Sequence, residues 1–180
     1  MATPDSRIRP IEPADLRAVA ELVYELAEYE RLRSECHLTT AQLDSALFGP
    51  APALYGLVAC NAGDVVGYAL YFLNFSTWEG VHGIYLEDLY VRPDQRGSGL
   101  GRGLLLALAG IARDNGYARV EWSVLDWNAP SIAFYQSMGA VPMSGWSVYR
   151  LTGPALLAAA STEHTAIPKT ATPKKEVESG

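Results

Sequence analysis

The stretch from Ile84 to Gly103 reads IYLEDLYVRPDQRGSGLGRG and decides the fold. Its β-branched and aromatic residues are typical of a strand, which carries two adjacent acids, Glu87 and Asp88. The pattern then breaks at Pro93, passes a cluster of glycines and turns into a Leu- and Ala-rich helix that continues to about Arg113. Strand, glycine turn and helix together predict an anion site, because glycines allow close backbone approach and a helix N-terminus offers unpaired N–H groups.

The spacing of the glycines limits which anion this turn can hold. A dinucleotide fold requires G-x-G-x-x-G. When the motif starts at Gly97, its third glycine is replaced by Arg102, and when it starts at Gly99, by Leu104. A P-loop requires Lys-Ser or Lys-Thr after its last glycine, which is absent here. What remains is a basic residue followed by x-x-G-x-G, from Arg96 onward. Taken alone, this hexapeptide is either a phosphate-binding loop or a glycine-rich turn.

Composition favours one globular domain of mixed α/β class. The chain has 180 residues, 49% of them hydrophobic, and helical and strand-like patterns alternate along it. No run of 18 apolar residues and no signal-peptide pattern occurs, so we expect no membrane association. Two cysteines, Cys36 and Cys60, provide neither a disulfide framework nor a metal-binding spacing. We therefore expect a reduced, cytoplasmic protein without a metal.

The formal charge of −6 bears on the partners. The last twenty residues hold three acids and three lysines, so the whole excess of negative charge lies in the rest of the chain. A nucleic-acid-binding surface is basic, and we therefore expect no nucleic-acid partner. A negative field instead attracts a cationic substrate.

Periodicity predicts the elements before the central stretch. A short strand comes first, followed by a helix with a continuous apolar stripe and a second helix that Thr39 or Thr40 caps. Two strands then form a hairpin around a turn with the composition Asn-Ala-Gly-Asp. The expected ranges are 6–11 and 14–33, then 38–48, and finally 54–60 and 65–72.

Further elements surround and follow the central unit. We expect a loop over 74–80, which either packs on the surface or forms a wall of the substrate pocket. A strand over 119–125 precedes a helix over 129–138, which Asn128 caps and Gly139 ends. Two final strands are expected at 141–143 and 147–151. Beyond about residue 160 the composition predicts disorder.

The two adjacent acids face opposite sides of a regular strand. By the period of two, Glu87 shares a face with Tyr85 and Leu89, while Asp88 shares the other with Leu86 and Tyr90. One acid therefore points toward the core unless a bulge intervenes. A buried acid requires a partner, so one of the two has either a functional role or backbone hydrogen bonds.

Tyr135 is the other candidate for chemistry. It lies two helical turns after Asn128, on the same face, and is either a packing residue or a proton donor. The cysteines and the scattered histidines have no motif that would place them in a catalytic group, so we interpret them as structural.

Four motifs in order resemble one known family. The loop R-G-S-G-L-G is similar to the pyrophosphate-binding loop of the GCN5-related N-acetyltransferases. Together with Y-L-E-D-L-Y-V, V-L-D-W-N-A-P-S and A-F-Y-Q-S-M-G-A, it resembles the diamine (spermidine/spermine) N-acetyltransferases. The segments S-T-W at 76–78 and V-L-D-W-N at 124–128 are more similar to the thialysine N-ε-acetyltransferase branch. The resemblance covers most of residues 6–151.

The resemblance implies a role for each matching position. It implies that Tyr135 is the general acid and that Glu87 takes the proton of the amine, directly or through water. It implies that the substrate amine is bound by Tyr29, Glu30, Glu87, Asp88, Glu121, Trp122 and Ser123. It implies that acetyl-coenzyme A (acetyl-CoA) is bound by Leu89, Tyr90, Val91, Arg96, Gly97, Ser98, Gly99, Leu100, Gly101, Arg102, Asn128, Pro130 and Ser131.

The expected chemistry suits these residue types. An alkylamine with a pKa near 10 must lose a proton before it attacks a thioester, and a carboxylate both holds the cation and accepts that proton. Polyamine-acetylating relatives carry an acid where this chain has Ser76, which favours a shorter, amino-acid-like amine over a long polycation, without excluding spermidine.

The resemblance also implies the architecture and the assembly. We expect the α/β GNAT fold, with a mixed, mostly antiparallel sheet flanked by helices and splayed central strands. The catalytic domain is expected over 1–157, with a disordered tail over 158–180, and the protein is expected to form a homodimer. Two other functions remain open, namely acetylation of protein lysines or N-termini and non-catalytic sensing of acetyl-CoA.

Overall fold

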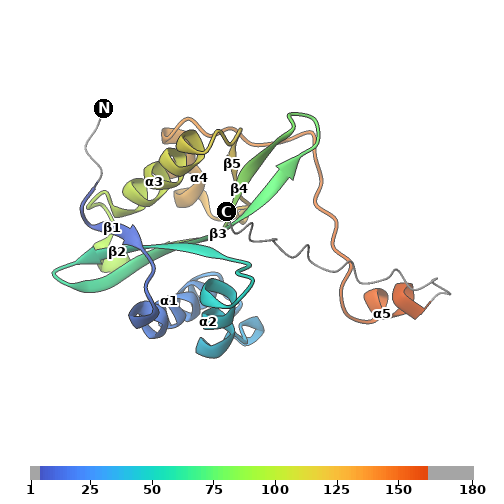
Figure 1. The fold of residues 1–180 in the computed structure, drawn as a ribbon, viewed down its shortest axis with the longest axis horizontal. Coiled ribbons are helices and arrows are strands. Elements are labelled where there is room, and N and C mark those ends of the chain that lie inside the picture. Colours follow the sequence, from blue (N-terminus) through green and yellow to red (C-terminus); the bar gives the residue numbers. More distant parts are fainter. Residues whose placement is uncertain (1–4, 162–180) are drawn as a thin grey trace, which may run out of the picture. The chain divides into compact units, whose positions relative to one another are not determined.

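A five-stranded sheet forms the centre of the protein (Figure 1). The computed structural model describes residues 5–161. The strands lie in chain order, and each pair is antiparallel except β4 and β5, which are parallel. This confirms the expected mixed, mostly antiparallel sheet. The strands are β1 (Ile8–Pro10), β2 (Tyr55–Asn61), β3 (Asp64–Ser76), β4 (Val81–Val91) and β5 (Val120–Glu121).

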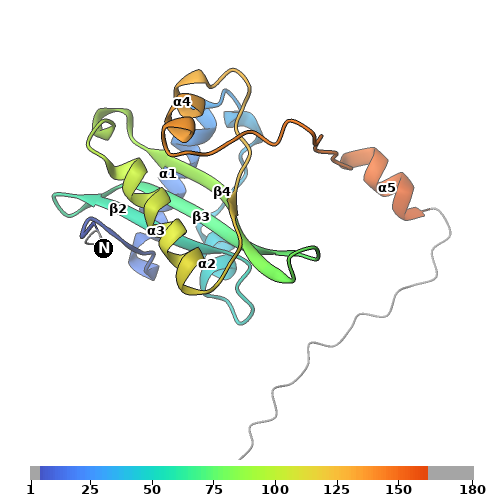
Figure 2. The same cartoon turned by 90° about the horizontal axis from the view of Figure 1, so that it is seen from above.

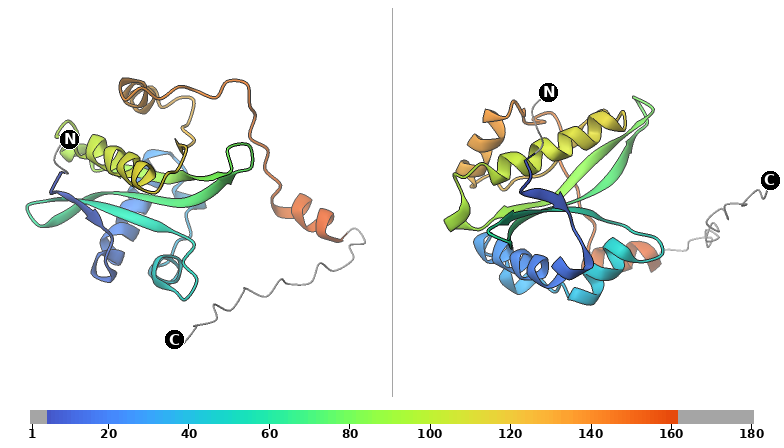
Figure 3. Two further views of the ribbon diagram at one scale, coloured as in Figure 1. Left: turned by 45° about the horizontal axis from the view of Figure 1, so that its top comes forward. Right: turned by 60° about the vertical axis from the view of Figure 1, so that its left-hand side comes forward.

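Helices cover both faces of the sheet (Figures 1 and 3). Helices α1 and α2 pack on one face, and α3 crosses the strands on the other (Figure 2). Helix α4 lies on the α3 side, where its aromatic residues pack against the same buried cluster. The helices are α1 (Leu16–Tyr29), α2 (Thr40–Phe48), α3 (Leu100–Asp114) and α4 (Ala129–Ser137), with short 3-10 turns at Pro13–Asp15, Arg33–Glu35 and Pro93–Gln95.

The apolar stripes of the helices explain the two layers of the core. Helix α3 buries residues at helical spacing against the sheet, and α1 does the same on the opposite face. Tyr68, in the middle of β3, is fully buried within the α1 layer. The buried residues of α3 are Leu100, Leu104, Leu105, Leu108 and Ala112.

The ends of the helices follow their predicted caps. Thr39 accepts a hydrogen bond from the N–H of Gln42 in a capping box, and Asn128 accepts one from the N–H of Ser131. After α4, Gly139 has a positive φ of 89°, as expected of a glycine that ends a helix.

A β-bulge in β4 changes the expected pattern of faces. Leu70 of β3 pairs with Asp88, but the next residue, Tyr71, pairs with Leu86, so Glu87 is an extra residue in β4. The prediction that Leu86, Asp88 and Tyr90 share a face is therefore wrong. Leu86 packs in the α3 layer, whereas Tyr90 packs in the α1 layer.

Strands β4 and β5 separate soon after they pair. Their parallel ladder holds two residue pairs, Ile84 with Val120 and Tyr85 with Glu121. The expected strand over 119–125 is therefore shortened to Val120–Glu121, because its partner changes direction at the bulge. The edge of β4 beyond Tyr85 consequently has no neighbouring strand in the described part of the chain.

The segment 74–80 is largely a continuation of the sheet. Strand β3 runs to Ser76, and the residues that follow form the turn of a β3–β4 hairpin. The expected loop is therefore shorter than predicted. The side chain of Trp78 at this turn is 90% exposed.

Residues 140–161 form a second compact unit that is described here by itself. The two strands expected at 141–143 and 147–151 are absent, since no segment of this unit pairs with them in the described residues. A helix, α5 (Gly153–Ser161), follows instead. Every residue from 141 to 161 is exposed, including Val141, Trp146 and Tyr149. The predicted disorder falls mostly on residues 162–180, which lie outside the described residues.

Among residues 5–161, none of the helices combines the length and the apolar character that crossing a membrane requires.

Candidate active site

A cleft lies where the C-terminal end of α1, the second half of β4 and the start of α4 meet. It borders the edge of β4 that β5 leaves unpaired. Twelve of the residues that the sequence predicted as site residues line it together. These are Tyr29, Glu30, Glu87, Asp88, Leu89, Tyr90, Val91, Arg96, Ser123, Asn128, Ser131 and Tyr135.

A hydrogen bond between distant elements closes one side of the cleft. The hydroxyl of Tyr29, at the end of α1, donates to Oδ1 of Asn128 at 3.0 Å. The same oxygen accepts the N–H of Ser131 and so caps α4. Asn128 is buried, and these two bonds satisfy an oxygen that would otherwise be costly to bury. This bond therefore ties the end of α1 to the start of α4.

Arg96 lines the cleft and contacts both β4 and the end of α1. Its Nε donates to the backbone oxygen of Val91 at 2.9 Å. Its guanidinium carbon lies 5.0 Å from the ring centre of Tyr29 and 5.6 Å from that of Tyr90, within range of cation–π attraction. Arg96 therefore places a positive charge at the C-terminal end of β4, beside the end of α1.

The two adjacent acids have different surroundings. Glu87, the extra residue of the bulge, is exposed to the cleft and to solvent. Asp88 points into the α1 layer, where the hydroxyl of Tyr68 donates to its Oδ2 at 3.3 Å. Burial, reinforced by the charge of Glu87, raises the pKa of Asp88 to about 6. Burial also raises the pKa of Glu30, which lines the cleft at the end of α1. The cleft thus brings together three carboxyl groups, and two of them, those of Glu30 and Asp88, are partly buried.

Tyr135 reaches the cleft from α4. Its ring packs against Trp122 and Phe134, with ring centres 4.8 Å and 5.3 Å apart. Burial, with a smaller contribution from the charge of Glu30, raises the pKa of Tyr135 to about 12. The hydroxyl therefore keeps its proton at neutral pH and is available as a donor.

The glycine turn lies at the N-terminus of α3, beyond the cleft. Gly97 and Gly99 have φ angles of 77° and 87°, a left-handed conformation that a side chain disfavours. Gly99 is the N-cap residue and provides no capping side chain. The first N–H groups of α3 consequently remain available to an anion, as at any uncapped helix N-terminus.

Comparison with known proteins agrees with this geometry. The model of the acetyltransferase (GNAT) family matches residues 18–140, which include strands β2 to β5, the glycine turn and α4. The chain belongs to the GNAT acetyltransferase family. The family prediction made from the four motifs is thereby confirmed, and the chain is an acyltransferase.

Two curated relatives and one solved structure illustrate the similarity. The chain is 36% identical to a thialysine N-ε-acetyltransferase of Bos taurus, over 83% of this chain and 94% of that protein. It is 31% identical to an L-ornithine N5-acetyltransferase of Arabidopsis thaliana, over 85% of this chain and 87% of the relative. An integron cassette protein of V. cholerae shares the fold, with a TM-score of 0.73 and 24% identity over 86% of this chain and 97% of its own.

Some predicted site residues of this GNAT domain lie outside the cleft. Trp122 packs behind the ring of Tyr135. Glu121 is paired with Arg119, whose Nε lies 3.0 Å from Oε2, and also accepts a hydrogen bond from Asn74. The others not among the lining residues are Gly97, Ser98, Gly99, Leu100, Gly101, Arg102 and Pro130.

The sequence analysis missed three residues of the site. Leu26 and Val124 line the cleft, and Tyr68 holds Asp88 from beneath. The apolar stripe of α1 includes Leu26, but only packing shows which end of that stripe borders a cleft. The bond from Tyr68 depends on the register of β3 and β4 around the bulge, which no sequence pattern marks.

Replacement of Asp88 by Asn tests the surroundings of this acid. A carboxyl whose pKa rises from 3.8 to about 6 on folding destabilises the folded protein once it ionises. Stability due to this group is therefore fully present below about pH 4 and is lost as the pH rises through 6. We expect Asp88→Asn to raise the free energy of unfolding by about 2 kcal/mol at pH 8 and to change it little at pH 4.

Urea denaturation at both pH values measures this difference. Asp44→Asn, at an exposed position of α2, is the matched control and is expected to change little at either pH. A wild-type protein that is more stable than Asp88→Asn at pH 8 would show that the ionised carboxylate is stabilised in the fold.

Proposed function

We propose that this protein transfers the acetyl group of acetyl-CoA to a primary amine of a small molecule. One observation carries the proposal: carboxyl groups and a protonated tyrosine face the same cleft at the open edge of β4. Glu87 and Asp88 line it from β4, and Tyr135 lines it from α4. A base and an acid at one cleft are what amine acylation requires.

The residues present fit acetyl-CoA. The glycine turn and the first amides of α3 suit a pyrophosphate, with Arg96 and Arg102 as nearby cations. The backbone of Leu89–Val91, on the unpaired edge of β4, would hold the pantetheine arm, and the capping group Asn128 with Pro130 and Ser131 would hold it from α4. When bound, the cosubstrate supplies a thioester, which is an activated acetyl group.

The charges of the cleft favour a cationic acceptor. Glu30, Glu87 and Asp88 line it, and Arg96 is the only basic residue among the lining residues. The guanidinium of Arg96 lies at the C-terminal end of β4, where its Nε donates to the oxygen of Val91, and the glycine turn begins directly after Arg96 in the sequence. An ammonium group is therefore attracted to the acidic part of the cleft, while phosphate is attracted to the other end.

Two proton movements complete the reaction. The bound ammonium group gives a proton to Glu87, directly or through water, and its nitrogen lone pair then attacks the acetyl carbonyl carbon. The N–C bond forms as the C–S bond breaks. The hydroxyl of Tyr135 donates its proton to the departing sulfur, and the second proton of the amine restores the tyrosine by way of solvent. No enzyme nucleophile is needed.

The relatives suggest the class of acceptor. Thialysine and ornithine, which their names specify, are amino acids whose side chains end in a primary amine. We propose an acceptor of this kind, with diamines and polyamines as alternatives. Ser76 gives little support to an amino-acid acceptor over a polyamine, because it lies at the β3–β4 turn and is not among the residues that line the cleft.

Release of coenzyme A across a panel of amines tests this function. We expect clear turnover with thialysine, lysine or ornithine and less with spermidine or putrescine. A lysine peptide tests the alternative of protein acetylation, which preference for the peptide would favour. Binding of acetyl-CoA without turnover of any amine would instead support a sensor and contradict the proposed reaction.

Tyr135→Phe tests the role of the acid. We expect kcat to fall by about 100-fold, because general acid catalysis contributes factors of this order, while the affinity for acetyl-CoA changes less than threefold. Tyr55→Phe removes an exposed hydroxyl far from the cleft and is expected to retain full activity. An unchanged kcat in Tyr135→Phe, measured at saturating substrates, would contradict the assignment.

We also propose a homodimer, a cytoplasmic location and a catalytic domain over 1–157. The apolar segment 141–151 supports the homodimer, because Trp146, Val148 and Tyr149 are at least 70% exposed and its backbone has no strand partner in the described residues. We expect sedimentation equilibrium to give a dimer that Trp146→Glu with Tyr149→Glu converts to a monomer. A wild-type monomer at micromolar concentration would contradict this.

A further inference from the structure

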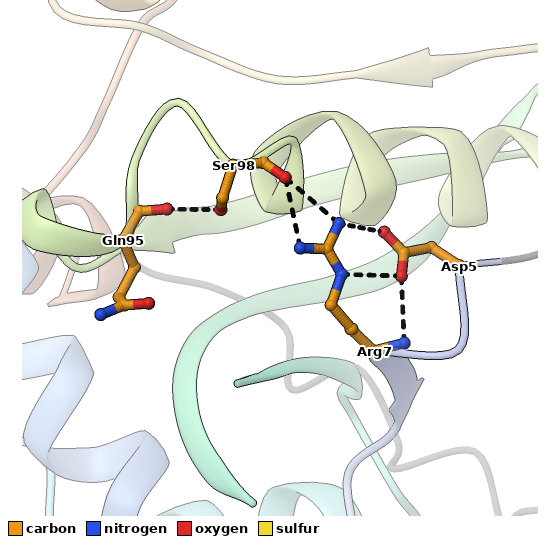
Figure 4. A network of polar contacts seen from close by, with 4 residues as sticks. All are labelled: Asp5, Arg7, Gln95 and Ser98. Atoms are coloured by element: carbon orange, nitrogen blue, oxygen red, sulfur yellow. Dashed lines mark hydrogen bonds and ion pairs between the residues drawn. The ribbon is translucent and has the colours of Figure 1, made fainter. Parts of the chain in front are cut away.

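The side chain of Arg7, near the N-terminus, contacts the glycine turn, which lies 91 residues further along the sequence. Its Nη1 and Nη2 each donate to the backbone oxygen of Ser98 at 3.2 Å (Figure 4). Arg7 precedes β1, and Ser98 lies between the two left-handed glycines of the turn. No prediction from the sequence involved Arg7.

Asp5 fixes the direction in which this guanidinium points. Its Oδ1 accepts the backbone N–H of Arg7 at 3.1 Å and Nε at 3.0 Å, and its Oδ2 accepts Nη2 at 2.7 Å. The planar guanidinium thus has one edge bound to Asp5 and its tip bound to Ser98 (Figure 4). Such a two-sided arrangement restricts a side chain that is otherwise partly exposed.

The turn itself needs such a restraint. Gly97 and Gly99 allow many backbone conformations, so ordering them costs more conformational entropy than ordering other residues. Ser98 has a second anchor within the turn, since its Oγ donates to the backbone oxygen of Gln95 at 2.6 Å. Arg7 therefore holds Ser98 from outside the turn, while Gln95 holds it from within.

The bond to Ser98 also fixes the next amide. A trans peptide is planar, with its C=O and N–H pointing in opposite directions. When Arg7 holds the oxygen of Ser98, the N–H of Gly99 must point away from Arg7. Gly99 is the N-cap of α3, so this is one of the amides expected to face an anion.

Close packing supports the same placement. A Cβ added at Gly103, in the first turn of α3, would lie 3.1 Å from Cγ1 of Ile8 and 3.3 Å from Oδ2 of Asp5. The glycine thus allows the N-terminal turn to lie directly against α3. Asp5 and Ile8, on either side of Arg7 in the sequence, therefore pack directly against α3.

We propose that Arg7, oriented by Asp5, is a positioning residue that preorganises the 96–101 turn for the pyrophosphate of acetyl-CoA. It acts through the Ser98–Gly99 peptide and does not itself contact phosphate. The inference rests on the proposed function, because it requires that the turn bind acetyl-CoA. Without the bond, the turn samples other conformations, and binding must restore the productive one.

Calorimetric titration with coenzyme A and with 3′-dephospho-coenzyme A tests the proposal. Both ligands carry the pyrophosphate, and only the first carries the ribose 3′-phosphate. We expect Arg7→Gln to raise both dissociation constants by about tenfold and equally, because a lost hydrogen bond from a charged donor has an effect of this size. We expect kcat at saturating acetyl-CoA to stay within twofold of wild type.

Two further variants complete the test. Arg17→Gln removes the same charge from an exposed position of α1 and is expected to change neither dissociation constant. Asp5→Asn keeps the guanidinium but loosens its orientation, and we expect it to weaken both ligands by a smaller factor. The double variant Asp5→Asn with Arg7→Gln should bind both ligands about as weakly as Arg7→Gln alone, because both substitutions act through the contact between Arg7 and Ser98. If Arg7→Gln fails to fold, the dissociation constants of Asp5→Asn alone test the proposal, and unchanged values would contradict it.

Three outcomes would overturn the proposal. Unchanged dissociation constants in Arg7→Gln would show that the contact with Ser98 is incidental. A loss confined to coenzyme A, absent with the dephospho ligand, would show that Arg7 contacts the 3′-phosphate directly. A wild-type protein that binds neither ligand would overturn both the proposed function and this inference. If the wild-type protein binds both ligands tightly and Arg7→Gln gives one of the two results above, only the inference is overturned.

Discussion

The extra residue at Glu87 changes the course of β4, and the site depends on that change. Before the bulge, β4 pairs on both sides, with β3 and with β5. After it, the pairing with β3 continues while β5 diverges, so one edge of Leu89–Val91 has no partner strand in the described residues. An open strand edge inside a domain is costly unless something pairs with it. Here Arg96 binds the oxygen of Val91, and a pantetheine arm would take that edge when bound.

The same bulge assigns different surroundings to two neighbouring acids. Glu87 remains in contact with solvent, whereas Asp88 enters the α1 layer and binds Tyr68. Adjacent residues of a regular strand would also face opposite ways, but Leu86 and Asp88 would then share a face. Because the bulge separates them, an apolar residue packs under α3 while an acid with a raised pKa faces the cleft. The acidic part of the cleft is therefore a consequence of strand geometry.

The glycine turn, proposed to bind phosphate, and the cleft are both held by contacts between segments that are distant in sequence. The turn at 96–101 follows β4 after the short 3-10 turn Pro93–Gln95, yet its contact with Arg7 comes from the segment before β1. At the other end of the cleft, Tyr29 of α1 holds Asn128 of α4. Each bond joins segments that are far apart in the sequence, and together they would give the site a defined shape before any ligand binds.

The sequence by itself determined the family, the element order as far as α4 and most of the residues of the cleft. Glycine spacing, helix caps and apolar periodicity act over a few residues, so the turn at 96–101, Asn128 and the core of α3 are readable from the chain. Only the tertiary structure decided the bulge at Glu87, the short β5 and the bonds made by Tyr68 and Arg7. These depend on strand register and on packing between distant segments. The segment 141–151 shows the same limit: its composition predicts strands, but a strand exists only where another backbone pairs with it.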